Sequence, residues 1–375
     1  RSAISSITSQ YVGANKLDEI KNLPAQAIAI IVSGSLLVLV ISYLFAEQIF
    51  QFYNASGSVL AYCVVYFKIR IFGFPFSLLV FAIFGTFRGL QNTFYPMIIA
   101  IIGASLNIVL DIILVYGVEG FIPAMNIEGA AYASVIAQIT MAVISVVLLL
   151  KKTTISLNMK LPFHQEIPKL LNMIGNLFIR TIALNTALYF ATSYATGYGK
   201  EYIAAYTIGL NIWLLGAFMV DGYSSAGNIL AGKLLGAKEY GSLIALSGKL
   251  TKYGFFTGMI IAGFGLVFYD AIGRVFTKDP LVLEQFYHVF WIVILAQPLN
   301  AITFIYDGMF KGMGEMKYLR NVLLLSTGFV FIPTLLFFDW LDYKLVAIWI
   351  AFTFWILARG IPLIFKFRNK FLPLM

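Results

Sequence analysis

The sequence predicts an all-helical, polytopic membrane protein, and two observations carry that prediction. Hydrophobic residues make up 60% of the 375 residues and charged residues only 11%, with a mean hydropathy of +0.88. A soluble domain carries about 25% charged residues. Apolar runs long enough to cross a hydrocarbon core of about 30 Å recur along the whole chain. They do not show the residue-by-residue alternation that marks the strands of a membrane barrel.

Ten apolar runs predict ten membrane-spanning helices joined by short polar loops, and a further helix ends in the first residues, 1–9. In order along the chain, the runs cover residues 23–45, 58–88, 94–117, 126–150, 166–196, 203–232, 245–268, 281–310, 319–339 and 343–365.

The net charge of +9 comes from basic residues that gather at alternate loops. Eighteen of the 26 Lys and Arg residues lie at one set of loops and span ends, and this set includes Arg88, Lys311 and Arg359. The positive-inside rule places that set in the cytoplasm, together with the C-terminus. The distribution indicates a multi-pass protein of the cell (inner) membrane, and no nucleic-acid partner is expected.

Cysteine and histidine are scarce. Cys63 is the single cysteine and His164 and His288 lie far apart, so we expect no disulfide, no zinc site and no cofactor. A membrane enzyme would need a His or acid cluster beside the membrane, and His164 near Glu166 is the one candidate. A contact within a linker is the simpler interpretation of that pair.

An internal repeat relates two parts of the chain. The stretch "GFPFSLLVFAIFGTFRGL" (73–90) aligns with "AQPLNAITFIYDGMFKGM" (296–313) at an offset of 223, with five identities, where composition alone gives roughly one or two. An even number of spans separates the copies, so both cross the membrane in the same direction. Parallel repeats of this kind are related by an axis along the membrane normal.

The repeat predicts a twelve-helix protein of two six-helix lobes with a pseudo-twofold axis along the membrane normal. The N-lobe covers 1–150, a basic cytoplasmic linker 151–165 and the C-lobe 166–375. The offset places the start of the N-lobe about 57 residues before Arg1, so helix 1 and most of helix 2 are expected to lie upstream of this chain.

Pro75 and Pro298 occupy equivalent positions in the two copies. Proline within a membrane helix frees a carbonyl group that neighbours can satisfy, and it gives a kink. We therefore expect both helices to bend at the same depth. Arg88 and Lys311 follow near the predicted cytoplasmic helix ends, where basic side chains are favoured.

Ionisable residues inside the membrane are functional candidates because they are costly there. Of the 17 acidic residues, only Asp111, Asp221 and Asp307 fall well inside predicted spans, and Arg180 is the clear basic one. Asn107 and Asp111 are four residues apart and share a helix face. A carboxylate beside an amide can take up and release a proton, although a structural hydrogen bond between helices is the alternative.

The remaining mid-membrane candidates lie in the C-lobe. Arg180 and Asp221 fall at similar depth on successive helices, which predicts a buried charge pair with either a structural or a gating role. Asp307 lies one helical turn before Lys311, which favours a local ion pair. Asn211, in the same span as Asp221, joins the candidates.

The segments "FRGLQNTFYP", "LNIVLDIILVYGVEG" and "IEGAAYASVIAQ" resemble the fourth to sixth helices of the multidrug and toxic compound extrusion family, of the MOP flippase superfamily. "VDGYSSAGNILAGKLLGAKE" and "YDGMFKGMGEMKYLRNVLLLS" resemble its DinF-like branch. The resemblance implies an antiporter that exports cationic or amphipathic compounds against H⁺ or Na⁺. It matches Asn107 and Asp111 to the helix-five motif of the N-lobe cavity, and Ser134 to a helix-six threonine.

The resemblance also implies small organic cations or amphipathic drugs as cargo, membrane lipids as surroundings and a monomer, with no identifiable Na⁺ site. A flippase for lipid-linked precursors shares the fold and stays open as the alternative. Its anionic substrates would require basic cavities, whereas acids outnumber bases three to one in the predicted spans. A non-transporting scaffold would need neither paired prolines nor buried acids.

Overall fold

The computed structural model describes residues 1–53, 55–158 and 161–374, and the regular segments in those ranges are helices without strands. Nine helical segments of the described residues are long and apolar enough to cross a bilayer. A bent pair, α12 (Pro280–Leu295) and α13 (Gln297–Gly312), brings the number to ten if it forms one span. The predicted all-helical, polytopic fold is therefore confirmed.

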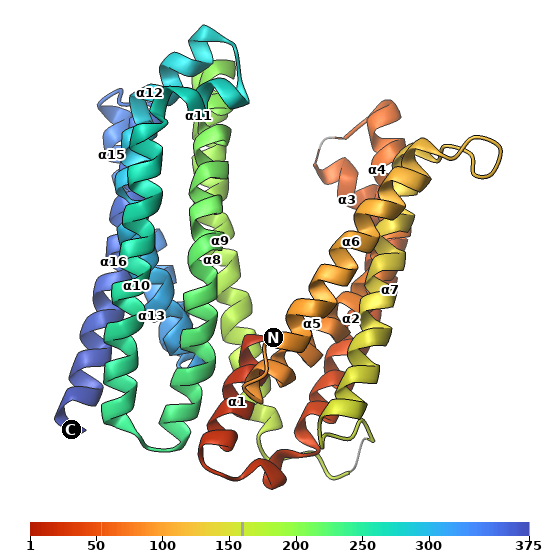
Figure 1. Ribbon diagram of the computed structural model, residues 1–375. Coiled ribbons are helices and arrows are strands. Elements are labelled where there is room, and N and C mark those ends of the chain that lie inside the picture. Colours follow the sequence, from red (N-terminus) through yellow and green to blue (C-terminus); the bar gives the residue numbers. More distant parts are fainter. Residues whose placement is uncertain (54, 159–160, 375) are drawn as a thin grey trace. The chain divides into compact units, whose positions relative to one another are not determined.

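The chain divides into two compact units, Arg1–Leu170 (unit 1) and Leu171–Met375 (unit 2), each drawn as a bundle of helices in Figure 1. Part of the predicted linker, residues 159–160 with Lys160, lies outside the described residues. Unit 1 contains α1 (Ser2–Gly13), α2 (Leu23–Leu44), α3 (Ala46–Phe52), α4 (Gly57–Arg70), α5 (Phe74–Gly89), α6 (Phe94–Tyr116) and α7 (Asn126–Lys152).

Unit 2 begins within α8 (Ile167–Tyr198). Its other helices, besides α12 and α13, are α9 (Lys200–Gly236), α10 (Tyr240–Val267), α11 (Tyr269–Phe276), α14 (Met316–Ser326), α15 (Ile332–Trp340) and α16 (Leu345–Phe371). A π-helical turn, η3 (Thr327–Phe331), joins α14 to α15.

The internal repeat is visible in the helix bounds of the two units. The bounds of α5 and α13 differ by 223 at both ends, as the sequence offset requires. The neighbours of these helices correspond too, because α1 and α2 pack on α5 while α9 and α10 pack on α13. Each unit therefore repeats one pattern of helix packing around a central short helix.

Paired glycines allow that central helix to approach its neighbour closely. A Cβ atom added at Gly308 would lie 2.2 Å from the carbonyl oxygen of Ser224, and one at Gly312 would lie 2.0 Å from that of Asn228. In unit 1, a Cβ atom added at Gly85 would likewise lie 2.6 Å from the carbonyl oxygen of Arg1. Glycines four residues apart are typical of closely packed membrane helices.

The two prolines each stand in the first turn of a helical segment. The expected bend is present at Pro298, whereas the segment around Pro75 forms one continuous span, Gly57–Gly89. Pro75 is the second residue of α5, after a 3₁₀ turn, η2 (Ile71–Gly73), and Pro298 is the second residue of α13, which lies at 49° to α12. Proline is tolerated there because the first N–H groups of a helix need no intrahelical acceptor. At the break in unit 2, Gln297 Nε2 donates to the carbonyl oxygen of Val293 at 3.1 Å.

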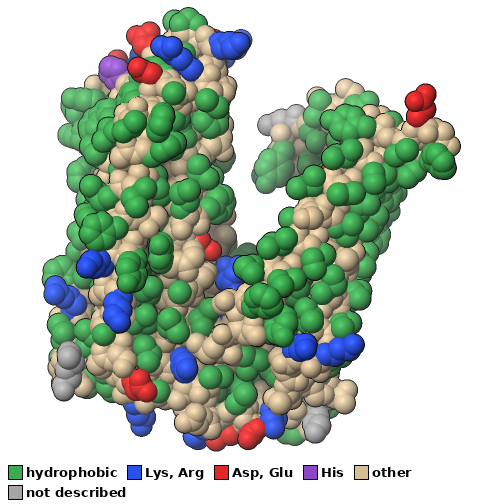
Figure 2. Space-filling view, viewed as in Figure 1, with side chains coloured by type: hydrophobic (Ala, Val, Ile, Leu, Met, Phe, Trp, Pro, Cys, Tyr) green, Lys and Arg blue, Asp and Glu red, His purple; other side chains and the backbone are tan. Residues whose placement is uncertain are grey.

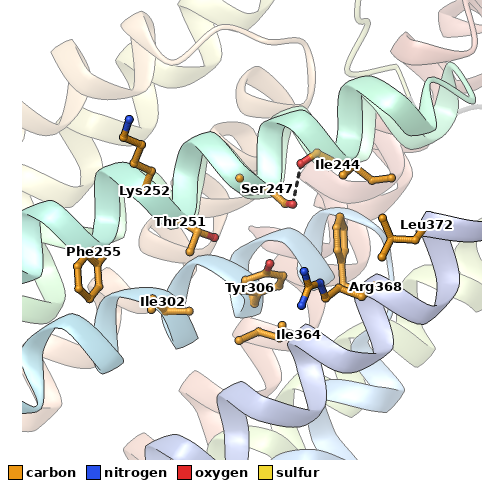
Figure 3. Close-up of a pocket in the computed structure, with 12 residues that line it drawn as sticks. Ile244, Ser247, Thr251, Lys252, Phe255, Ile302, Tyr306, Ile364, Arg368 and Leu372 are labelled. Carbon is orange, nitrogen blue, oxygen red and sulfur yellow. Dashed lines mark hydrogen bonds between the residues drawn. The ribbon is translucent and has the colours of Figure 1, made fainter. Parts of the chain in front are cut away.

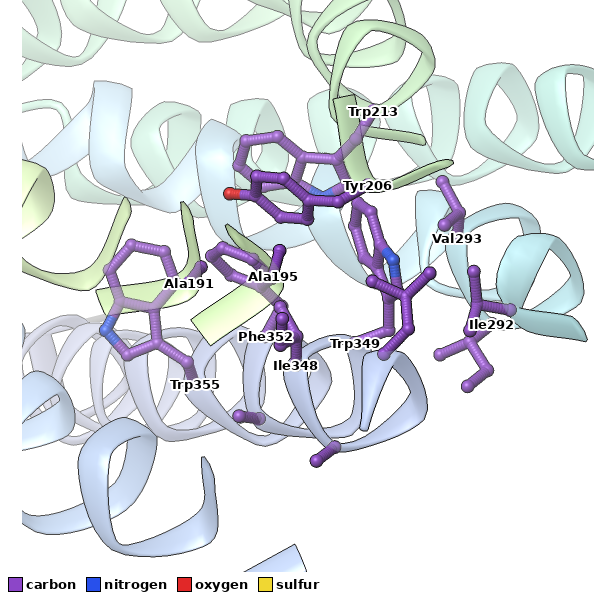
Figure 4. Close-up of a cluster of buried hydrophobic side chains, with 14 of the residues drawn as sticks. Ala191, Ala195, Tyr206, Trp213, Ile292, Val293, Ile348, Trp349, Phe352 and Trp355 are labelled. Atoms are coloured by element: carbon purple, nitrogen blue, oxygen red, sulfur yellow. The ribbon is translucent and has the colours of Figure 1, made fainter. Parts of the chain in front are cut away.

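Unit 2 contains a dense aromatic and aliphatic core. Trp213 and Phe352 stack with ring centroids 6.0 Å apart, and Phe352 also contacts Trp349 and Trp355. Small side chains of α8, such as Ala191 and Ala195, let these rings pack against it (Figure 4). Burial of such large rings stabilises the bundle, so α8, α9, α12 and α16 form one packed body.

Outside the core, apolar side chains cover the lengths of the helices, while most charged groups stand near helix ends (Figure 2). One such end is fixed by Glu315, which accepts hydrogen bonds from Lys370 at 2.6 Å and Lys366 at 3.3 Å. Partial burial opposes ionisation of this carboxyl. The hydrogen bonds and charges of Lys370 and then Lys366 outweigh it and hold the pKa of Glu315 below its usual value.

Replacing Gly308 by alanine should destabilise unit 2, because the new methyl group meets a helix backbone that cannot move aside independently. We expect a loss of about 1–3 kcal/mol, as for other overpacked sites, and a fall of several degrees in the melting temperature of the detergent-solubilised protein followed by circular dichroism. Gly222→Ala on α9 is the matched control, since a Cβ there meets no atom within 4 Å. Equal melting temperatures for the two variants would contradict the close crossing.

Candidate functional site

A buried cluster of charged side chains lies toward the C-terminal end of α13 in unit 2, with Asp307 at its centre. Arg180 Nη2 donates to Asp307 Oδ1 at 2.5 Å, and Lys311 Nζ lies 2.5 Å from Oδ2. Arg359 Nη2 approaches Oδ1 to 4.0 Å. Three basic groups on α8, α13 and α16 therefore surround one carboxylate, which leaves two positive charges in excess.

The sequence predicted only part of this cluster. The local pair of Asp307 and Lys311 is confirmed, but Arg180 and Arg359 were not expected to join it. Arg359 stands at the middle of the 27-residue α16, is 3% exposed and lies 4.7 Å above the ring of Trp355. Its position within the apolar stretch "WILARGIP" was the available signal that it lies inside a helix and not at a cytoplasmic end.

The predicted pair of Arg180 with Asp221 is wrong. Arg180 binds Asp307 on α13, whereas Asp221 is exposed on α9 and accepts a hydrogen bond from Ser225 Oγ of its own helix at 3.4 Å. Similar depth on adjacent helices does not fix which faces meet, and α9 turns Asp221 away from Arg180. Asn211 is also exposed on α9.

The expected excess of acids over bases in the membrane is wrong for unit 2. Arg359 is buried, and the Lys311 side chain is only 22% exposed, so both belong to the cluster instead of standing free at a helix end. An isolated buried charge is costly, and a carboxylate shared by several cations lowers that cost only in part. The cluster therefore makes this part of unit 2 electropositive.

A second group of candidates lies in unit 1, around a pocket of about 300 Å³ between α5, α6 and α7. Asn107 from α6 and Ser134 from α7 both line it, so two residues that are 27 positions apart come to one site. Asp111 lies one turn beyond Asn107 on α6, half-buried and outside this lining. Arg70 Nη1 donates to Gln138 Oε1 at 2.8 Å along the pocket wall.

The polar groups of this pocket are incompletely satisfied. Asn107 Nδ2 is buried and has no hydrogen-bond partner in the described part of the chain. An unsatisfied buried donor costs about 1–3 kcal/mol, so an acceptor atom that enters the pocket would be bound favourably. Asp111 makes neither an ion pair nor a hydrogen bond with any described residue. The α6 carboxylate is thus free of the basic partners that surround Asp307.

The histidine, cysteine and acidic side chains form a further set of candidate residues. Within residues 1–53, 55–158 and 161–374, no three His, Cys, Asp or Glu side chains lie close enough together to hold a metal ion. The predicted contact of His164 with Glu166 is present, because the Glu166 N–H donates to His164 Nδ1 at 3.1 Å. The backbone N–H of His164 donates to Gln26 Oε1 at 2.8 Å. The bond to Gln26 attaches the linker to α2.

Two repeated units of membrane-spanning helices, each with polar residues inside its spans, define a polytopic membrane protein of the transporter type. The MatE family model matches residues 1–113 and 177–336, and the chain belongs to this family. Members of the family are transporters and not enzymes.

Individual relatives agree with this placement. The chain is 28% identical to Protein DETOXIFICATION 42 of Arabidopsis thaliana over 91% of its own length and 65% of the relative's. It is 25% identical to DNA damage-inducible protein F of Escherichia coli over 97% of its own length and 78% of that protein, which confirms the resemblance to the DinF-like branch.

A crystal structure of a MATE protein in the bent conformation superposes with a TM-score of 0.91 at 19% identity, over 100% of this chain and 83% of that one, which shows a shared fold. The chain spans less than two thirds of the length of the plant relatives it matches, 65% of DETOXIFICATION 42 and 55% of DETOXIFICATION 43.

Replacing Asp307 by asparagine should destabilise unit 2 strongly. The change leaves Arg180, Lys311 and Arg359 facing one another without a counter-charge, and loss of one partner from a buried ion pair costs about 3–5 kcal/mol. We expect a lower yield of monodisperse protein and a lower melting temperature, and adding Lys311→Met should recover part of the loss. Asp221→Asn is the control and should change neither quantity. A loss equal to that of Asp307→Asn would instead support a pair between Arg180 and Asp221.

Proposed function

We propose that the chain acts in an antiporter that exports cationic or amphipathic compounds in exchange for H⁺ or Na⁺ by alternating access. The observation that carries the proposal is the pairing, on α6, of an unneutralised carboxylate with an unsatisfied amide. Asp111 has no basic partner among the described residues, and Asn107, which lines the pocket, has a buried Nδ2 without an acceptor in those residues. A carboxylate inside a membrane helix is a functional candidate by default.

The choice of unit 1 for ion coupling follows from the state of the other acids. Asp307 already serves three basic groups, so binding a cation there would require breaking two close ion pairs. Asp221 lies exposed and bonds only within its helix. Of the three acids in the predicted spans, Asp111 alone is partly buried and has neither an ion pair nor a hydrogen bond with the described residues. This supports a role in binding H⁺ or Na⁺.

Coupling at Asp111 follows from its change of charge. When the site opens to water, the carboxylate takes up a proton or Na⁺, and the neutralised side chain no longer attracts a cationic compound. When the site closes and reopens on the other side, the ion leaves and the carboxylate regains its charge. Linkage requires the converse, so bound cargo must lower the affinity for the ion by the same factor.

The alternative function, a flippase for lipid-linked precursors, is favoured by one observation in unit 2. The Asp307 cluster carries three basic groups and one acidic group, and anionic head groups require such an excess of positive charge. The cargo distinguishes the two functions. Export of a cationic dye supports the antiporter, whereas translocation of a pyrophosphate-linked lipid without dye export supports the flippase.

The proposed setting is the inner membrane, with the C-terminus in the cytoplasm and the protein as a monomer. The basic end of α16, with Lys366, Arg368 and Lys370, supports this orientation through the positive-inside rule.

Cysteine accessibility tests the orientation in a Cys63→Ser background. Asn369→Cys should react with a membrane-impermeant maleimide only in inverted vesicles, and Lys278→Cys, after α11, only in intact cells, because an odd number of spans separates the two positions. Labelling of both from the same side would contradict the topology.

Asp111→Asn should abolish gradient-driven export of a cationic dye from vesicles while the protein still folds and reaches the membrane. The amide keeps the size of the side chain but cannot change its charge, so ion and cargo no longer compete. Asn107→Ala should weaken export and shift its pH optimum, because the amide next to the carboxylate is lost. Measuring export under an imposed pH gradient and under an imposed Na⁺ gradient identifies the coupling ion.

The matched control for this experiment is Asp221→Asn, an acid-to-amide change in another membrane-spanning helix. It should leave export close to the wild-type rate. If Asp111→Asn exports the dye at the wild-type rate across a range of pH, the proposal that unit 1 holds the ion-coupling site is wrong.

A further inference from the structure

A groove of about 550 Å³ runs along unit 2 between α10, α13 and α16, on helices that carry large exposed apolar side chains. It involves none of the residues assigned to ion coupling or to the Asp307 cluster. Ile302 and Phe255 line one end, and Arg368 and Leu372 line the other (Figure 3). Lys252 also belongs to the lining near Phe255, but its side chain extends away from α13 (Figure 3). The groove is therefore amphipathic along its length, with a largely apolar end and a basic end at Arg368.

Two hydroxyl groups near the middle of the groove lack partners. Tyr306 is only 7% exposed, its hydroxyl is directed toward α10 and it makes no hydrogen bond with any described residue (Figure 3). Thr251 Oγ1 is buried and likewise has no partner. Ser247 differs, since its hydroxyl donates to the carbonyl oxygen of Ile244 at 2.8 Å. Of the two unpartnered hydroxyls, only that of Thr251 is itself a buried atom, and such a group beside an open groove can be satisfied by a polar group from outside the chain.

The charge at the basic end is also unpaired. Lys366 and Lys370, two residues before and after Arg368, both contact Glu315. Arg368 has no carboxylate within ion-pair distance in the described ranges, and its guanidinium lies beside Tyr306 (Figure 3). The same turn of α16 therefore uses two basic residues to hold its own structure and directs a third into the groove. A guanidinium is well suited to bind a phosphate group.

We propose that this groove binds one anionic phospholipid of the surrounding bilayer. The lipid phosphate accepts hydrogen bonds from Arg368, Tyr306 and Thr251, and one acyl chain lies along Phe255 and Ile302. A phospholipid fits both features, because its phosphate matches the basic end and its chain matches the apolar end. Ile260 on α10 and Phe365 on α16 are exposed apolar side chains of the same helices. In a bilayer they would contact the lipid from which the bound molecule would come. Basic pockets between membrane helices bind anionic head groups in this way.

Native mass spectrometry of the delipidated protein tests the proposal. The probes are dioleoyl phosphatidylglycerol, dioleoyl phosphatidylcholine and sodium phosphate, each titrated separately. We expect one phosphatidylglycerol to be retained with at least about tenfold preference over phosphatidylcholine, because only the anionic lipid carries a net charge for Arg368. Sodium phosphate should neither bind measurably nor displace the lipid, since it lacks the chain.

Two kinds of variant locate the site. Arg368→Gln should lower phosphatidylglycerol affinity about tenfold, with Arg274→Gln, an exposed arginine on α11, as its control. Gly248→Leu should block the groove, because Gly248 lines it and a Cβ there meets open space. Gly263→Leu on the same helix is its matched control, since a Cβ there is also unobstructed and Gly263 lies outside the groove lining. All four variants should keep the wild-type melting temperature.

Three results would overturn the proposal. Equal retention of phosphatidylglycerol and phosphatidylcholine would remove the head-group specificity. Unchanged phosphatidylglycerol binding in Gly248→Leu would place the lipid elsewhere. Displacement of the lipid by tetraphenylphosphonium, with loss of that displacement in Gly248→Leu, would make the groove a cargo site.

Discussion

The close crossing of a short central helix over its neighbour is the constraint on which the rest of each unit depends. At Gly308 and Gly312 the backbone of α13 touches the backbone of α9, and at Gly85 and Gly89 the backbone of α5 touches α1. A larger side chain at these glycines would hold the helices apart, so close van der Waals packing of the backbones depends on them. The other helices then pack around a pair whose positions are already set.

The break before Pro298 accompanies this close crossing. The chain changes direction by 49° between α12 and α13, so that α12 packs in the aromatic core while α13 crosses α9 at Gly308. A proline in the first turn of the second helix costs no hydrogen bond, and Gln297 satisfies the carbonyl group left at the end of the first. The break thus lets one span serve two packing surfaces.

The sequence predicted what depends on local pattern and missed what depends on how helix faces meet. Apolar runs gave the spans, and the 223-residue offset gave the equivalent helices, because both are properties of the chain itself. The pair of Asp307 with Lys311 was predictable, since four residues span one turn. The contact of Arg180 with Asp307 joins residues 127 positions apart, and it depends on the rotation of α8 and α13 about their axes, which helix periodicity in strongly apolar runs does not determine. The positive-inside rule describes loops and span ends, and it does not hold for Arg359 because this residue lies in the middle of α16.

The repeat gives the two units one backbone plan but opposite distributions of polar groups. At the offset of 223, Asp307 of α13 corresponds to Phe84, a buried residue of α5, and Asn107 of α6 corresponds to Val330. Unit 2 therefore places a carboxylate on its central short helix and pairs it with basic groups there, whereas unit 1 keeps that helix apolar and carries unpaired polar groups on α6. A carboxylate held by ion pairs is fixed in place, while an unpaired carboxylate is free to bind an ion or a proton. The same fold thus carries a paired acid in unit 2 and an unpaired acid in unit 1, and this difference is the reason for proposing Asp111 as the ion-binding group.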